Sequence, residues 1–178
     1  VTLVLTGIAV NAFAGAVIGL LSYVASDAQL RGIVFWTLGS LAQAAWSDVA
    51  LVTVMGGVGL ALAWGLGRSL DVVSLGQTQA QHLGIPVERV RMLSLLAAAL
   101  LAAGATAVAG QILFVGLVIP HAVRFYIGPS HRSLILGSAL VGAVLVALAD
   151  VVSRTIVAPA ELPLGVLTSL VGAPVFFA

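Results

Sequence analysis

The chain has 178 residues, of which 61% are hydrophobic and 7% are charged, and its mean hydropathy is +1.22. Soluble domains carry about a quarter charged residues, so this composition excludes a soluble globular protein and indicates an integral membrane protein. The net charge of +1 gives no basic patch for nucleic acid, and the absence of cysteine excludes disulfides and thiolate metal sites.

Five apolar runs follow one another along the chain, separated by polar connections. A helix needs about 20 apolar residues to cross the core of a bilayer. The first two runs are long enough to span, the third is longer than one span requires, and the last two are short. In chain order, the runs cover residues 1–25, 49–66, 94–119, 134–149 and 164–178. Both ends of the sequence lie inside apolar runs and no signal-peptide pattern opens the first one, so we expect the C-terminal part of a longer membrane protein.

The first run carries small or polar residues at every fourth position, namely Gly7, Asn11, Gly15 and Gly19. This spacing places them on one helix face, where they allow close approach of another helix. Ordinary packing within the chain explains the glycines, but the amide of Asn11 needs a polar partner inside a membrane. Asn11 and Gly15 are therefore candidates for either a transport pathway or a helix interface, and the sequence leaves both open.

The segment from Leu30 to Leu41 is amphipathic and has tryptophans at Trp36 and, just beyond it, Trp46. Tryptophan is enriched where a membrane meets water. The segment therefore predicts a short helix lying along the external membrane surface.

A compact polar segment, Ser74–Pro86, interrupts the apolar sequence. Ser74, with Gln77 three residues later, fits a capping box and predicts a short helix that begins just after it. Gly84 suits the left-handed residue that ends a helix, and Pro86 suits the start of the next. From spacing alone, a solvated cytoplasmic loop with some helix is a sufficient interpretation.

The arginines indicate how the run 94–119 is divided. A single crossing would distribute them almost evenly over the two sides of the membrane. A break near Gly110-Gln111, followed by a short helix over residues 113–126, places five on one side: Arg68, Arg89, Arg91, Arg124 and Arg132. Cytoplasmic loops favour arginine, so the sequence predicts the broken arrangement, with Arg31 and Arg154 outside. The predicted fold class is all-α, a polytopic transmembrane helical bundle of six helices with one short or broken.

Near the end of the chain, Asp150 and Arg154 are four residues apart and predict an ion pair within one helix. Glu161, just before Pro163, fits an acidic residue near the N-terminus of the last helix and is expected to be structural. The three histidines (His82, His121 and His131) lack metal-ligand spacing, so no metal site is expected.

Motifs of enzymes are absent from the sequence. It has no Gly-x-x-x-x-Gly-Lys phosphate loop, no His-Glu-x-x-His pair and no Gly-x-Ser-x-Gly elbow. We therefore expect no catalysis by this chain, and any ATP hydrolysis to belong to another chain.

Several sequence blocks together resemble one known family. Leu75-Gly-Gln-Thr-Gln-Ala80-Gln-His-Leu83-Gly84 is similar to the Leu-Gly-Glu-x-x-Ala-x-x-Leu-Gly signature of ABC-importer permeases for iron-siderophores, haem and cobalamin. The resemblance continues, in the family's order, through residues 35–41, 110–124, 161–165 and 172–174. Gln77 stands where the family commonly has Glu, so the capping geometry is kept and the charge is lost.

The resemblance implies a permease of ten transmembrane helices, of which residues 1–178 would be the last six. It further implies a homodimer in the cytoplasmic (inner) membrane of a bacterium or archaeon, two cytoplasmic ATP-binding subunits that hold ATP and magnesium, and an external substrate-binding protein. No cofactor is implied in this chain itself. Arg154 would meet the binding protein. A coupling loop over about residues 67–93 would contact the ATPase through Leu75, Gly76, Gln77, Ala80, His82, Leu83 and Gly84.

Two other functions remain open from the residues alone. An ion-gradient-driven secondary transporter or channel usually has ionisable groups at mid-membrane or paired broken helices, and here Asp150 is the only acid near a span. A purely structural membrane scaffold is the other alternative. Copurification with an ATPase would distinguish the importer from both.

Overall fold

The computed structural model describes residues 2–156 and 162–177, and all regular structure in these residues is helical. The chain divides into two compact units, one up to Thr37 and one from Leu38 onwards. Each unit is described by itself.

The first unit consists of two helices, α1 (Thr2–Val24) and α2 (Asp27–Leu38), the second of which reaches one residue past the unit's boundary. The turn between them is held by Gln29, whose Oε1 accepts hydrogen bonds from the Ser26 N–H (3.0 Å) and hydroxyl (3.1 Å). This is half of a capping box, and it fixes the start of α2. The short helix predicted after the first span is thus present, three residues earlier than its sequence pattern suggested.

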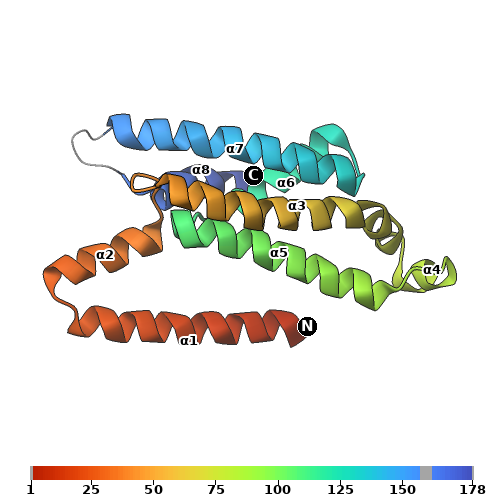
Figure 1. The fold of residues 1–178 in the computed structure, drawn as a ribbon, viewed down its shortest axis with the longest axis horizontal. Helices are drawn as coiled ribbons and strands as arrows, with labels where there is room; N and C mark the ends of the chain where they lie inside the picture. The colour runs from red at the N-terminus through yellow and green to blue at the C-terminus, as the bar shows by residue number, and fades with distance from the viewer. Residues whose placement is uncertain (1, 157–161, 178) are drawn as a thin grey trace. The chain divides into compact units, whose positions relative to one another are not determined.

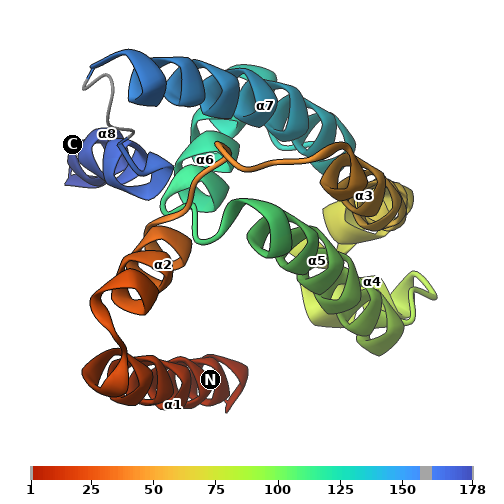
Figure 2. The ribbon, with the colours of Figure 1, turned by 60° about the vertical axis from the view of Figure 1, so that its left-hand side comes forward.

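The second unit contains six helices in the described residues, which pack as a bundle (Figures 1 and 2). The long helix α3 packs against α5 on one side and α7 on the other. The shorter α6 packs on α7, and α8 packs on both of them. Their bounds are α3 (Trp46–Ser74), α4 (Gln77–His82), α5 (Val87–Ala109), α6 (Val115–Ile127), α7 (His131–Ile156) and α8 (Leu164–Phe177).

Four helices of the described chain, α1, α3, α5 and α7, are long and apolar enough to cross a membrane, and α6 and α8 are shorter apolar helices. The four long helices correspond to four of the predicted membrane helices, and α6 and α8 lie where the two others were predicted; the count of six membrane helices stays a prediction. The predicted break in run 94–119 is confirmed, because α5 ends at Ala109 and α6 starts at Val115. The predicted end of the second span at residue 66 was wrong: α3 continues to Ser74, since polar residues can extend a helix beyond its apolar stretch.

The helices of the second unit approach each other through small side chains. A Cβ atom at Gly59 of α3 would lie 2.8 Å from Cγ of Leu101 on α5, so this contact needs glycine. The few fully buried residues are mostly small or medium in size, such as Ala97 and Ala109, while most large apolar side chains are exposed. Such a surface suits lipid, where helices associate by close packing rather than by a hydrophobic core.

The two ends of the second unit differ in charge. The α3–α4–α5 connection and the α6–α7 connection lie at the same end (Figure 1). The five arginines predicted to share a side all lie at helix ends or starts there, whereas Arg154 is near the opposite end of α7. Their clustering agrees with the predicted topology, and the side of the membrane on which they lie stays a prediction.

Candidate docking surface and the junctions that position it

The short helix α4 follows α3 after a two-residue turn. The Leu75 N–H donates to the Val72 carbonyl at 3.1 Å and the Gly76 N–H to the Val73 carbonyl at 3.1 Å, which closes α3. The Ser74 hydroxyl donates back to the Asp71 carbonyl at 2.6 Å, within its own helix. The predicted capping box between Ser74 and Gln77 was therefore wrong, because the hydroxyl is used by the preceding turn. Gly76 is the N-cap of α4, with no side-chain hydrogen bond.

The end of α4 is a Schellman motif centred on Gly84, which has φ +77°. The Gly84 N–H donates to the Gln81 carbonyl at 2.9 Å, and the Ile85 N–H donates to the Ala80 carbonyl at 3.0 Å. These are the two bonds that define the motif, and its central residue must adopt the left-handed conformation. The prediction for Gly84 is confirmed, and α5 begins directly afterwards with Pro86 as its N-cap.

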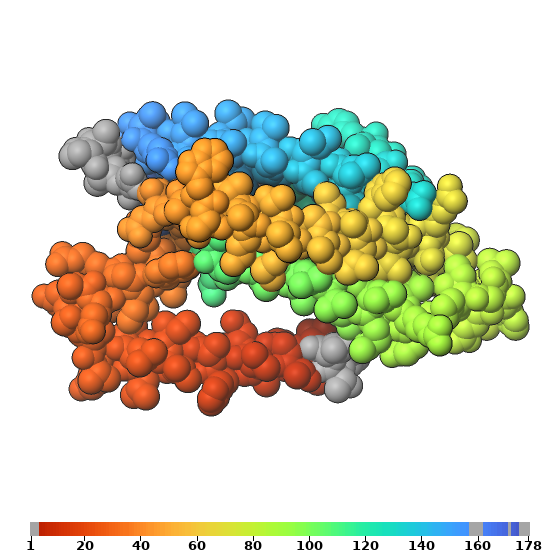
Figure 3. Space-filling view, in the orientation of Figure 1, coloured from red at the N-terminus to blue at the C-terminus, as the bar shows by residue number. Residues whose placement is uncertain are grey.

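One side of α4 is buried and the rest is exposed. The side chain of Ala80 is 0% exposed, and α4 packs on α3 and α5. The exposed positions are polar along the helix and apolar at its two flanks, where Leu75 is 72% and Leu83 is 68% exposed. We call residues Leu75–Gly84 the coupling surface; Figure 3 shows this segment, in yellow-green, projecting at one end of the second unit. Its exposed polar residues are Gln77, Thr78, Gln79, Gln81 and His82.

The seven predicted coupling residues therefore have different environments. Leu75, Gln77, His82, Leu83 and Gly84 are exposed, Gly76 is half-buried, and Ala80 is buried. Ala80 anchors α4 to the bundle, whereas the exposed residues are available to a partner.

Asp71, in the last turn of α3, joins this helix to the first residue of α7. One carboxylate oxygen, Oδ1, accepts the His131 N–H at 2.8 Å and lies 2.6 Å from the Nδ1 of the same residue. A helix start leaves backbone N–H groups without internal partners, and a carboxylate there is stabilised by the helix dipole. Asp71 thus acts as a cap for α7 supplied from another helix. We call this contact, together with the two described next, the α3–α7 junction.

The next residue of α7, Arg132, completes the junction. Its Cζ lies 4.6 Å from the centroid of the Trp64 ring, a cation–π contact. A Cβ at Gly67 would lie 2.5 Å from Cγ of Arg132, so the backbone of α3 at Gly67 packs directly against Arg132 of α7. Trp64, Gly67 and Asp71 recur at helical spacing on one face of α3, and all three meet the first turn of α7. Sequence reasoning missed this junction, because no local pattern pairs residues 60 positions apart.

At the opposite end of α7, the predicted ion pair is confirmed: Arg154 Nε donates to Asp150 Oδ2 at 2.9 Å. Arg154 Nη2 also donates to the Leu41 carbonyl at 3.4 Å. The side chain of Arg154 remains 44% exposed. Glu161, expected near the start of the last helix, lies outside the described residues.

Backbone hydrogen bonds tie three segments together at this same end. The Ser40 N–H donates to the Ala109 carbonyl at 2.9 Å, and the Leu164 N–H donates to the Gly39 carbonyl at 2.9 Å. Gly39 has φ +73°, and a Cβ there would lie 2.6 Å from the Gln111 carbonyl oxygen. The segment after α2, the end of α5 and the start of α8 are therefore fixed to one another by main-chain contacts.

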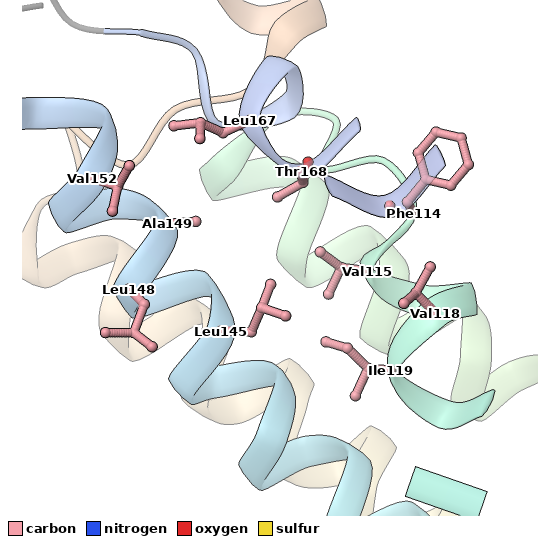
Figure 4. Close-up of a pocket in the computed structure, with 11 residues that line it drawn as sticks. Phe114, Val115, Val118, Ile119, Leu145, Leu148, Ala149, Val152, Leu167 and Thr168 are labelled. Atoms are coloured by element: carbon pink, nitrogen blue, oxygen red, sulfur yellow. The ribbon is translucent and has the colours of Figure 1, made fainter. Parts of the chain in front are cut away.

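An apolar cavity of about 250 Å³ lies between α6, α7 and α8 (Figure 4). Among the described residues that line it, Thr168 is the one with a polar side chain, and its hydroxyl donates to the Gly165 carbonyl of its own helix at 3.3 Å. The described lining is therefore almost entirely apolar. It is lined by Phe114, Val115, Val118, Ile119, Leu145, Leu148, Ala149, Val152, Leu167, Thr168 and Gly172.

The predicted face of α1 is uncovered within the first unit. Asn11 is exposed and its side-chain amide has no hydrogen bond in the described residues, and a Cβ at Gly15 would meet nothing within 4 Å. The roles suggested for Asn11 and Gly15 stay predictions. Among the described residues, no group of three His, Cys, Asp or Glu side chains is placed to hold a metal ion.

Four apolar helices of the described chain long enough to cross a membrane, joined to a projecting polar helix, define the class of a polytopic membrane protein. Over residues 1–178 the chain matches the model of the FecCD transport family, and it belongs to that family. This confirms the resemblance read from the sequence.

Three permeases are similar in sequence to this chain. The hemin transport system permease protein HmuU of Yersinia pestis is 45% identical over 98% of this chain and 52% of its own length. The vitamin B12 import system permease protein BtuC of Vibrio cholerae is 41% identical over 98% of this chain and 52% of its own. The iron(3+)-hydroxamate import system permease protein FhuB of Bacillus subtilis is 44% identical over 83% of this chain and 38% of its own.

A solved structure has the same fold. It is described as an inward-facing conformation of a metal-chelate type ABC transporter, with a TM-score of 0.89 and 34% identity over 98% of this chain and 56% of that chain. The chain spans about half the length of the curated permeases that cover it almost fully.

Proposed function

We propose that this chain forms part of the membrane-spanning permease subunit of an ABC importer, which carries an iron chelate (siderophore), haem or cobalamin across a cytoplasmic membrane. The family membership and the named cargoes of three relatives support this cargo class. A separate ATP-binding subunit, holding ATP and magnesium, drives the cycle. A second permease copy completes the pathway, and an external binding protein delivers the cargo.

The observation that carries this proposal is the form of the coupling surface. The six-residue helix α4 is closed at its C-terminus by two backbone hydrogen bonds and anchored by Ala80, and it presents polar side chains between two exposed leucines. The two leucines, 72% and 68% exposed at a polar end of the bundle, are the apolar side chains that a docked partner would cover. A rigid short helix of this kind can transmit the movement of a motor subunit to α3 and α5, on which it packs.

The test of function uses the whole gene product that contains this sequence, co-expressed with the ATP-binding subunit that we expect to be encoded beside its gene. The two proteins should copurify, and proteoliposomes holding both should take up a ferric siderophore, haem or cobalamin only when ATP and the binding protein are supplied. Uptake that follows an ion gradient without ATP would identify the secondary transporter instead. A protein that neither binds an ATPase nor moves any of these solutes would be a scaffold.

The side of the membrane can be tested independently. This sequence has no cysteine, so once any cysteine elsewhere in the whole gene product is replaced, one cysteine can be introduced at exposed Gln79 on α4 and, as the matched variant, another at exposed Gln43 at the other end of the second unit. In intact cells, a membrane-impermeant maleimide should label the variant at Gln43 and leave the variant at Gln79 unlabelled until the membrane is opened. Labelling of Gln79→Cys from outside would refute the assignment of α4 to an ATPase.

A further inference from the structure

We propose that Asp71 is a positioning residue that makes the coupling surface and α7 move as one body during the transport cycle. The inference rests on the proposed function, since it concerns how movement of α4 reaches the rest of the permease. It assigns a role to the α3–α7 junction, which no local sequence pattern revealed.

The first step is the short connection between Asp71 and α4. The Ser74 hydroxyl bonds the Asp71 carbonyl at 2.6 Å, and only Leu75 and Gly76 separate α3 from α4. The backbone N–H groups of both these residues bond the last turn of α3. The link between the two helices is therefore short and hydrogen-bonded, and a force on α4 acts directly on the turn that carries Asp71.

The second step is the contact that passes this force to α7. Oδ1 of Asp71 meets both the backbone N–H and the ring of His131, at 2.8 Å and 2.6 Å. Hydrogen bonds that involve a carboxylate are shorter and stronger than those between neutral groups. The Asp71 side chain is 37% exposed and that of His131 is 21% exposed, so water reaches the contact only in part.

The third step is the stiffness of the junction. Arg132 packs directly on Gly67, and its guanidinium stacks over Trp64, so α7 is held along about two turns of α3. The buried Nε of Arg132 has no hydrogen-bond partner in the described residues, and the Trp64 ring lies beside the guanidinium. If the start of α7 slid along α3, the Asp71 hydrogen bonds and the stacking of Arg132 on Trp64 would break at the same time.

The fourth step is the reach of α7. With 26 residues at about 1.5 Å each, the helix is about 39 Å long, so its two ends lie far apart. Its far end carries Asp150 and Arg154 and borders the apolar cavity. A displacement of α4 that is passed to the start of α7 therefore arrives at the residue proposed to meet the binding protein.

The experiment measures the ATP hydrolysed per cargo molecule imported by the whole gene product, reconstituted with its ATPase and binding protein. Asp71→Ala should raise this ratio about tenfold, the scale on which losing one charge-assisted hydrogen bond shifts an equilibrium, while the ATPase still copurifies. The matched control is Asp48→Asn: this carboxylate also accepts a backbone N–H, from Ala45 at 2.8 Å, but at the far end of α3 and within one helix start. The ratio of the control should match that of the wild type.

A covalent rescue separates transmission from simple loss of stability. In the double variant Asp71→Cys/His131→Cys, the free thiols should give the high ratio, and a short bifunctional thiol reagent should return it towards the wild-type value. Rescue is expected only if the two positions must stay together through the cycle. A reagent that leaves the ratio high, or that blocks import, overturns the proposal.

The remaining outcomes are also decisive. If Asp71→Ala does not assemble, Asp71→Asn and His131→Gln replace it; both weaken the contact, and an unchanged ratio in both overturns the proposal. Equal effects of Asp71→Ala and Asp48→Asn would likewise overturn it. If the wild-type complex itself imports nothing with ATP, the proposed function has failed; if it imports normally and the Asp71 variants do too, only this inference has failed.

Discussion

Replacing Gly84 with valine tests the coupling surface through its backbone alone. Gly84 has φ +77°, and a Cβ built there meets nothing within 4 Å, so a side chain would have room in the permease. The cost is conformational: the left-handed region disfavours L-residues by about 1–2 kcal/mol, and β-branched residues are genuine outliers there. A penalty of about 1–2 kcal/mol changes a population ratio about 5–30-fold.

The expected consequence is a coupling surface that leaves its docked conformation. Without the left-handed residue, the bonds from Gly84 to Gln81 and from Ile85 to Ala80 cannot both form, and the end of α4 frays. Movement of the ATPase would then be absorbed by the frayed turn. We expect Gly84→Val to reduce ATP-driven uptake about 5–30-fold, with ATP hydrolysis much less affected.

The assay compares ATP hydrolysis and cargo uptake in proteoliposomes containing the whole gene product and its ATPase. Gly84→Asn is the matched control, because asparagine tolerates the left-handed region while adding a side chain of similar size. It should retain most of the uptake. Full uptake by Gly84→Val would refute the reasoning, and an equal loss in Gly84→Asn would show that the side chain, rather than the backbone, disturbs the partner.

Three further predictions address other parts of the chain. Ala80→Glu should release the ATPase in copurification, because it buries a carboxylate at a position with 0% exposure, whereas Gln81→Glu on the exposed side should not. Gly172→Ala should destabilise the protein by about 1–3 kcal/mol and lower its melting temperature, because the new Cβ would lie 2.5 Å from a side chain at the start of α6. Gly116→Ala should leave the melting temperature unchanged, because a Cβ there meets nothing within 4 Å. Arg154→Ala should slow association of the binding protein about tenfold in stopped-flow measurements at low salt, an effect that vanishes at high salt; equal rates would exclude its docking role.

Local patterns predicted the helices and several of their ends correctly. The left-handed Gly84 and the pair of Asp150 with Arg154 each depend on residues within a few positions of one another. The break after Ala109 was predicted instead from the distribution of arginines along the chain. The start of α4 was the exception: a Ser74 hydroxyl has acceptors both ahead of it and behind it, and the sequence does not say which one it uses.

Contacts between distant residues could not be predicted. Neither the pairing of Asp71 with His131 nor the bond between Leu164 and Gly39 follows from periodicity, because each depends on how whole helices pack. A half-exposed acid near a helix end is usual, so Asp71 gave no signal by itself. The contacts of Arg132 depend on Gly67 and Trp64, which share one face of α3 with Asp71, and no local pattern links this face to residue 132.

The sequence blocks that resemble the family lie mostly at helix ends, and the physics of a membrane accounts for this. In the spans, one apolar side chain can replace another with little effect, because lipid solvates all of them. At helix ends, backbone groups lack internal partners and must find specific ones. Ser40 bonds the end of α5, Leu164 bonds Gly39, and Ile85 bonds Ala80 through main-chain atoms that fit only if the neighbouring residues allow it. Resemblance concentrated at such points therefore indicates a shared backbone framework.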